Sequence, residues 1–250
     1  GLEAILGWPS AAAMRFSEPS IPTVLRQLAE RGVDRVAAII LSPQFSPLLM
    51  GGYERAIEGA RAAIGPGAPE AVVAGAWHLE PAFVGGLGAR IRTGIANAEQ
   101  RDGMRPAVLL TAHSLPLRVA REEPGYLDQL EATALAVAAA AGLARDGWTF
   151  CWQSAGHEPG EWMKPDFADL MPGFAAAGKR AVLVAPVQFL ADHLETLYDI
   201  DVGAREQAEA SGLRFERVQS LNDAPELAAA LAAVARRTLA TVGEPAGAPA

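Results

Sequence analysis

His113 stands directly after residues 107–112 (AVLLTA), an apolar segment that is typical of a buried strand. A neutral imidazole at the end of a strand can bind a transition-metal ion or accept a proton near neutral pH. Pro116 restricts the backbone shortly afterwards, which favours a fixed position for His113 at the edge of the sheet. The alternative is a loop histidine that is hydrogen-bonded to the backbone, and position alone leaves both interpretations open.

Three carboxylates follow later in the chain at helical spacing. Asp192, Glu195 and Asp199 stand at i, i+3 and i+7, so on a helix they would share one face. Like charges at this spacing repel by about 0.2–0.5 kcal/mol per pair, which favours a bound cation or a proton path along the face. The alternative is that Asp192 caps the helix and Glu195 completes a capping box, and the two roles are compatible. His193 points away from this face and is expected to be structural.

Other reactive side chains lack the context that their chemistry needs. Ser154 lies in the run QSAG, but Trp152 occupies the position where a nucleophile elbow needs its first glycine, which argues against a hydrolase. The glycines within residues 85–88 do not follow a strand in the dinucleotide-binding pattern. Cys151 is the single cysteine, so this chain forms no internal disulfide, four-cysteine iron–sulfur cluster or cysteine-rich zinc site. We expect Cys151 to be a small buried apolar residue.

The composition is that of a globular protein with an acidic surface. The chain has 250 residues, enough for one large α/β unit or two small lobes, and 50% of them are hydrophobic. Its net charge of -8 argues against binding to nucleic acid or to anionic lipid. The longest apolar runs, residues 132–144 and 181–191, are shorter than the ~18 residues of a membrane span. With no secretory signal, we expect a cytoplasmic protein without a membrane span; because the first residue is not Met, we also expect truncation or processing.

Helical and strand patterns alternate along the chain. The predicted strands are residues 35–41, 71–77, 107–112, 149–153, 180–186 and 213–218. The predicted helices are residues 20–32, 53–64, 80–99, 126–141, 166–177, 192–199 and 225–241. This alternation predicts an α/β fold of parallel sheets covered by helices on both faces. Ligands bind beyond the carboxyl ends of such strands, so the informative positions are residues 42–46, 77–78, 113–114, 154–156 and 187–189.

A series of spaced motifs resembles one enzyme family. In chain order they are LSPQFS at residues 41–46 with Gly51 and Tyr53, AHSLP at 112–116, Tyr126 with Gln129-Leu130, WQS at 152–154, Trp162 with Pro165, and PVQFLADHLETLYD at 186–199. The series is similar to that of the ferrochelatases, which insert ferrous iron into a porphyrin in haem synthesis. No single motif decides the resemblance, but the ordered series is highly specific and runs from about residue 14 to residue 237.

The resemblance implies two chelatase-type, Rossmann-like lobes, each a parallel sheet flanked by helices, with the first lobe incomplete. It divides the chain into a remnant of the N-terminal lobe (1–105), a C-terminal lobe (106–222), a closing helix that packs back on the first lobe (223–241) and a frayed tail (242–250). The family's initial strand and porphyrin-contacting loop have no counterpart in the sequence. That piece would carry an iron-coordinating tyrosine and propionate-binding arginines.

The resemblance also assigns roles to individual residues. His113 matches the family's metal-binding histidine and Glu195 its partner carboxylate, which makes the two both catalytic residues and metal ligands. Asp199 continues an acidic path for protons or metal, although Gly203 stands where some relatives carry a further acid, and Tyr53 lines the porphyrin site. The implied partners are a porphyrin and Fe²⁺, both as substrates, with no bound organic cofactor, no iron–sulfur cluster and a monomeric protein.

Two segments bear on which porphyrin is the substrate. Residues 152–156 (WQSAG) and 191–195 (ADHLE) resemble the branch that acts on coproporphyrin III, which we favour over protoporphyrin IX. Two alternatives remain. The chain could be a non-catalytic fragment that binds porphyrin or haem, or a cobalt chelatase of the same fold, although cobalt chelatases usually use more than one histidine in the cleft.

Overall fold

The computed structural model describes residues 1–156 and 159–240 and divides the chain into two compact units. The first comprises Gly1–Glu80 together with residues 228–240, and the second comprises the described part of Pro81–Leu227. The predicted frayed tail 242–250 lies outside the described residues. The predicted boundary lay at residue 105, so the division differs from it by assigning a whole helix to the second unit. No helix in the described part of the chain is long and apolar enough to cross a bilayer.

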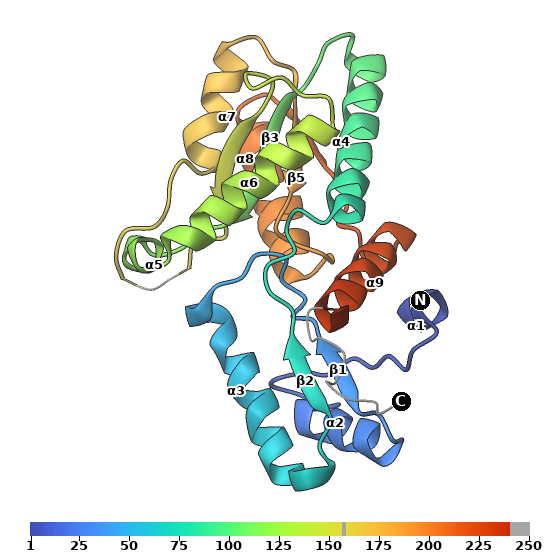
Figure 1. Cartoon of the computed structure of the whole chain (residues 1–250). Coiled ribbons are helices and arrows are strands. Elements are labelled where there is room, and N and C mark those ends of the chain that lie inside the picture. The colour runs from blue at the N-terminus through green and yellow to red at the C-terminus, as the bar shows by residue number, and fades with distance from the viewer. Residues whose placement is uncertain (157–158, 241–250) are drawn as a thin grey trace. The chain divides into compact units, whose positions relative to one another are not determined.

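The first unit is built on a small parallel sheet of two strands, β1 (Arg35–Ala38) and β2 (Glu70–Val73) (Figure 1). Its helices are α1 (Leu2–Leu6), α2 (Ile21–Glu30), α3 (Pro47–Ile64), the 3₁₀ turn Gly65–Gly67 and most of α9 (Pro225–Ala240). α2 starts where the sequence predicts, because the Ser20 hydroxyl accepts the backbone N–H of Thr23 at 3.4 Å. From Ala228 onward α9 belongs to this unit, and Arg237 pairs there with Glu80 at 2.8 Å.

The second unit contains a four-stranded sheet, all parallel, in the order β4-β3-β5-β6. The strands are β3 (Ala107–His113), β4 (Thr149–Gln153), β5 (Ala181–Pro186) and β6 (Arg214–Arg217). The helices are α4 (Pro81–Asp102), α5 (Leu117–Glu122), α6 (Pro124–Ala140), α7 (Phe167–Ala176), the π-helix η2 (Glu195–Ala204) and α8 (Arg205–Ala210). The predicted α/β class with parallel sheets is confirmed.

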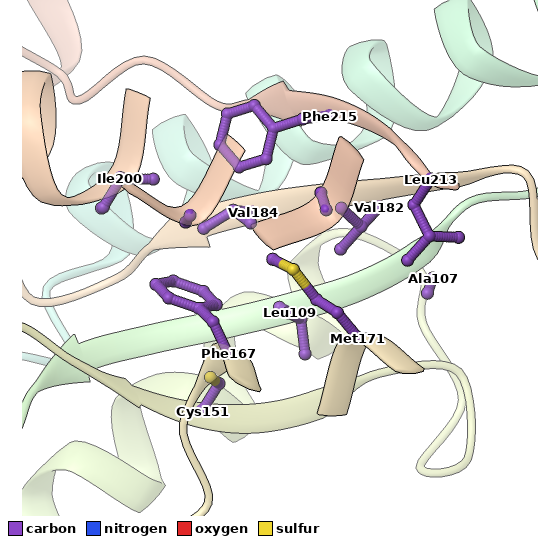
Figure 2. Close-up of a cluster of buried hydrophobic side chains, with 12 residues drawn as sticks. Ala107, Leu109, Cys151, Phe167, Met171, Val182, Val184, Ile200, Leu213 and Phe215 are labelled. Carbon is purple, nitrogen blue, oxygen red and sulfur yellow. The ribbon is translucent and has the colours of Figure 1, made fainter. Parts of the chain in front are cut away.

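Alternation along the strands divides the second unit into layers. Leu109 of β3 and Val184 of β5 point to the face that α7, η2 and α8 cover, and the cluster of Figure 2 fills this layer. Ala112 of β3 points to the opposite face, where it packs with Tyr126 and Leu130 of α6. Because side chains of a strand alternate between faces, His113 falls on the same face as Leu109, which is the face of η2.

Cys151 lies inside this core, as predicted (Figure 2). Burial raises the pKa of its thiol, and the nearby negative charges of Asp166 and Asp169 raise it further. A thiol that resists ionisation is a poor nucleophile and a poor metal ligand. Cys151 therefore contributes packing to the fold.

The structure differs from the predicted elements at several strand and helix ends. β1 and β2 end after four residues each, and α3 begins at Pro47, before the start of the predicted helix 53–64. α5 was not predicted. The largest difference follows β5, where a short helix over residues 192–199 was expected. There the chain forms a π-helix from Glu195 to Ala204, which continues directly into α8.

Candidate active site

His113 is the last residue of β3, a strand in the middle of the four-stranded sheet. It stands in register with Gln153 of β4, and the next residue, Ser114, donates its N–H to the Gln153 carbonyl at 2.7 Å. The backbone N–H of His113 donates to Oε1 of Gln188, in the chain just after β5, at 2.7 Å. His113 is therefore held at the carboxyl edge of the sheet, as the sequence predicts.

The contacts of the His113 ring determine its tautomer. Nδ1 lies 2.6 Å from the carbonyl oxygen of Ser114. A carbonyl oxygen can only accept, so Nδ1 carries the hydrogen of the neutral ring and Nε2 carries the lone pair. The side chain is 29% exposed. Nε2 is therefore a partly exposed nitrogen that can bind a metal ion or take up a proton.

Glu195 is the residue that faces this nitrogen. Its Oε1 lies 3.8 Å from Nε2 of His113, and its side chain is 42% exposed. This separation is too long for a hydrogen bond. It suits a shared cation, because zinc–nitrogen and zinc–oxygen distances of about 2.0–2.2 Å allow one ion to contact both atoms. The structure therefore brings together two of the predicted site residues from segments 82 positions apart in the chain.

Hydrogen bonds of His193 and Thr196 hold the start of the helix that carries Glu195. The Nδ1 atom of His193 accepts the Glu195 N–H at 3.2 Å, and the Thr196 hydroxyl accepts the His193 N–H at 2.8 Å. His193 thus has the structural role that was expected of it. Asp192 and Glu195 do not form the capping box that was the alternative role for them, because η2 begins at Glu195. Its first turn is held by His193 and Thr196.

Asp192 lies before the helix and faces a different set of partners. It pairs with Arg217 at 2.7 Å and accepts hydrogen bonds from the Asn222 side chain and the Ser220 backbone. Burial opposes its ionisation, but the Asn222 hydrogen bond, the Arg217 charge and Ser220 outweigh that effect and hold the pKa of Asp192 below its ordinary value. The predicted stripe of three carboxylates on one helix is therefore wrong, because Asp192 is not on the helix.

Asp199 lies on η2, four positions after Glu195, and is half-buried. In a π-helix each turn takes more residues than in an α-helix, so residues i and i+4 remain on one side of the helix. Asp199 and Glu195 thus share a side of η2. The predicted acidic path is reduced from three carboxylates to these two.

Gln188 and Tyr126 are site residues to which the sequence gave no role. Gln188 accepts the His113 N–H and donates from Nε2 to the Tyr126 hydroxyl at 2.5 Å. Tyr126 is buried, which raises its pKa, while the hydrogen bond from Gln188 opposes the shift. The position of Gln188, just after β5, was the one available indication, since ligands are bound beyond strand ends.

Tyr53, the predicted porphyrin-binding residue, lies on α3 of the first unit. It lines an apolar cavity of about 430 Å³ within that unit, together with Met50 and Ile57 of the same helix. The guanidinium of Arg15 also lines the cavity, 5.4 Å from the centre of the Tyr53 ring, at the distance of a cation–π contact. An aromatic ring and a cation thus stand together in this cavity.

Comparison with known proteins is decisive for the family. The Ferrochelatase family model matches residues 2–239. The chain belongs to the ferrochelatase family. The predicted family membership is confirmed, and with it the expectation of an enzyme, since ferrochelatases insert metal into a porphyrin in haem synthesis.

Proteins named as ferrochelatases match this chain over most of its length. The ferrochelatase of Deinococcus radiodurans is 35% identical over 231 residues, which cover 92% of this chain and 72% of that protein. The coproporphyrin III ferrochelatase of Geobacillus kaustophilus is 31% identical over 232 residues, with the same coverage of 92% and 72%.

Among solved structures, SirB from Bacillus subtilis with Fe³⁺ matches with a TM-score of 0.64 at 12% identity, and the match covers 96% of this chain and 86% of that chain. At so low an identity this likeness shows the chelatase fold alone.

Proposed function

We propose that this chain inserts ferrous iron into coproporphyrin III, with His113 and Glu195 as the residues that hold the iron briefly and take up protons. The observation that supports this most strongly is the separation of 3.8 Å between Nε2 of His113 and Oε1 of Glu195. The Ser114 carbonyl supports it further, because it fixes the tautomer in which Nε2 has a free lone pair.

The reaction needs what these two groups offer. Fe²⁺ must exchange its bound water for the nitrogens of the porphyrin, and both pyrrole N–H protons must leave as the iron–nitrogen bonds form. The His113 imidazole and the Glu195 carboxylate can each accept a proton. Asp199, on the same side of η2, can then relay a proton from Glu195 toward solvent.

The small number of ligands suits a transient site. Sites that retain a metal generally use four protein ligands, whereas catalytic sites leave positions open. Within residues 1–156 and 159–240, no group of three or more His, Cys, Asp or Glu side chains is arranged to hold a metal ion. One imidazole and one carboxylate leave most of the iron's coordination positions open to porphyrin nitrogens. Iron is a substrate in this proposal, and no resident cofactor takes part.

The choice of coproporphyrin III is supported by relatives and by two segments of the sequence. Several relatives at 29–31% identity are named coproporphyrin III ferrochelatase. The segments WQSAG at residues 152–156 and ADHLE at 191–195 resemble that branch. We further propose that Tyr53 and Arg15 contact the porphyrin from the first unit. An aromatic ring can stack on the macrocycle and a cation can pair with a propionate.

The test is anaerobic insertion of Fe²⁺, with Zn²⁺ as a surrogate, followed through the porphyrin absorption bands. Coproporphyrin III and protoporphyrin IX are compared at equal concentrations. His113→Ala and Glu195→Gln are each expected to lower kcat by about 100-fold or more, because each removes a proton acceptor and a ligand. Glu206→Gln, the same substitution at an exposed residue of α8, serves as the matched control and should keep wild-type activity.

Three results would contradict the proposal. Faster insertion into protoporphyrin IX would overturn the substrate assignment. Wild-type turnover in both site variants would overturn the roles of His113 and Glu195. Porphyrin binding without insertion by wild-type protein would support a non-catalytic porphyrin-binding module, and a preference for Co²⁺ and a more carboxylated tetrapyrrole would support a cobalt chelatase.

A further inference from the structure

Arg217, the last residue of β6, is a cation buried beside the helix that carries Glu195. Its side chain is only 8% exposed. Its guanidinium forms a paired contact with Asp201, in which Nε donates to Oδ1 at 2.7 Å and Nη2 donates to Oδ2 at 2.8 Å. Its Nη1 donates to Oδ1 of Asp192 at 2.7 Å. One buried cation therefore joins two carboxylates.

The two carboxylates lie on either side of Glu195 in the chain. Asp192 precedes Glu195 in the loop before η2, and Asp201 follows it within η2. Asp192 is also fixed from the other direction, because its N–H donates to Oδ1 of Asn222 at 2.8 Å and its Oδ2 accepts from Nδ2 of Asn222 at 3.0 Å. Both ends of the segment that carries Glu195 are thus tied to β6 and the chain just after it.

The geometry of η2 makes it dependent on contacts with other parts of the fold. A π-helix of ten residues is long for a conformation that usually occurs as single-turn bulges. Glu195 stands at its first position, where a shift of the helix would move the carboxylate directly. The apolar side of η2 is fixed by Ile200 and Ala204 in the core, and Arg217 fixes the polar side.

We propose that Arg217 is a positioning residue, which holds η2 so that the Glu195 carboxylate faces Nε2 of His113. This inference rests on the proposed function of that pair. Arg217 acts through Asp192 and Asp201 and need not contact iron or porphyrin. An arginine suits this role because its planar guanidinium can donate to two carboxylates at once, whereas a lysine ammonium is a compact point charge.

The experiment compares Arg217→Ala and Arg217→Lys with a matched control on the same strand. Arg214, at the start of β6, pairs with the buried carboxylate of Asp102. Arg214→Ala therefore also removes one arginine–carboxylate pair from β6, but that pair does not flank Glu195. For each variant we measure thermal unfolding, Zn²⁺ affinity of the porphyrin-free protein by calorimetry, coproporphyrin III affinity by fluorescence, and kcat for Zn²⁺ insertion.

The expected result separates positioning from stability. Arg217→Ala should lower Zn²⁺ affinity and kcat by about 10- to 100-fold, the range found when the supports of metal ligands are removed. Its affinity for coproporphyrin III should stay at the wild-type value. Arg217→Lys should recover part of the loss, and millimolar guanidinium should restore part of kcat in Arg217→Ala. Arg214→Ala should lose stability but keep Zn²⁺ affinity and kcat.

A folded Arg217→Ala with wild-type Zn²⁺ affinity and kcat would overturn the inference and leave the proposed function intact. If Arg214→Ala lost as much activity as Arg217→Ala, the inference would also be overturned, because the loss would then follow from lower stability of the fold. If Arg217→Ala does not fold, Zn²⁺ affinity and kcat are measured in Arg217→Lys and Asp201→Asn, each of which keeps part of the network. Wild-type values in both variants would overturn the inference. Absence of insertion by the wild-type enzyme, or unchanged Zn²⁺ affinity in Glu195→Gln, would overturn the proposed function and the inference with it.

Discussion

At the scale of single residues, the pair His113 and Glu195 depends on neighbours that chemistry alone would not pick out. The Ser114 carbonyl sets the tautomer of His113, and Gln188 holds its backbone. His193 holds the backbone of Glu195. These supports act through a backbone carbonyl, an amide side chain and an imidazole ring, and none of them adds a carboxylate beside the residues that we propose to do the chemistry.

Gln188 offers a prediction at this scale. Gln188→Met keeps the length of the side chain but removes the acceptor for the His113 N–H, and an N–H left without its partner costs about 1–3 kcal/mol. We expect lower stability toward urea and a lower kcat for metal insertion. Tyr126→Phe is the matched control, because it removes only the hydroxyl that Gln188 contacts and leaves the bond to His113 in place.

In Tyr126→Phe we therefore expect a smaller loss of both stability and kcat. A Gln188→Met protein as active and as stable as Tyr126→Phe would show that the bond to the His113 backbone does not matter.

The sequence predicts residues at the site better than it predicts their supports. His113 follows from an apolar strand with a histidine at its end, and Glu195 and Asp199 follow from the resemblance to a family. The network around Arg217 does not follow, because the partners of that residue, Asp192 and Asp201, are distant in sequence and meet only in the folded chain. Arg217 itself has nothing unusual in its sequence context, a charged residue near the end of a short strand.

At the scale of elements, the strands were predicted well where both faces are buried. β3 and β5 are buried along almost their whole length, so they appear as continuous apolar runs. The helix after β5 was predicted at the wrong length and of the wrong kind. A periodicity of 3.6 residues indicates an α-helix, and no simple pattern in a sequence indicates the wider π-helix, which tertiary contacts such as those of Ile200 and Arg217 stabilise.

Among the glycines of α4, Gly88 lies where a side chain would not fit. A Cβ at Gly88 would stand 2.7 Å from the Cβ of Ala140 and 2.8 Å from its carbonyl carbon, so α4 and α6 approach closely there. We expect Gly88→Ala to destabilise the protein by about 1–3 kcal/mol, because the backbone of α6 must shift. Chemical denaturation with matched m-values would measure this.

Gly85 is the control, since a Cβ there meets no atom within 4 Å. Gly85→Ala is expected to stabilise the protein by about 0.5–1 kcal/mol through the lower entropy of its unfolded chain. Equal effects of the two substitutions would contradict the role given to Gly88 in the contact between α4 and α6.

At the scale of the whole molecule, each of the two units carries one part of the proposed function. The second unit contains the pair that we propose to bind iron and accept protons, and the first contains the cavity lined by Tyr53 and Arg15. The fold is shared with a chain of only 12% identity, so it does not by itself determine the substrate. The substrate must be read from the side chains that each unit presents.

Global stability should depend on pH through Asp192. Its pKa is lower in the folded protein than in the unfolded chain, since the contributions of Asn222, Arg217 and Ser220 together exceed the opposing effect of burial. A carboxyl whose folded pKa is depressed stabilises the protein above its unfolded pKa and loses that contribution as pH falls through the folded value. Asp192→Asn should therefore be less stable than wild type at neutral pH, and the difference should shrink as the pH falls below about 5.

Urea unfolding of both proteins across this range measures the difference directly. Other carboxylates titrate in the same range, but they are common to both proteins and cancel in the comparison. Asp128→Asn provides a control with the same change of charge. Asp128 is an exposed residue of α6 and is not one of the carboxylates that pair with Arg217. A difference between wild type and Asp192→Asn that stays constant with pH would mean that Asp192 stabilises the fold by its shape and hydrogen bonds, without a contribution from its charge.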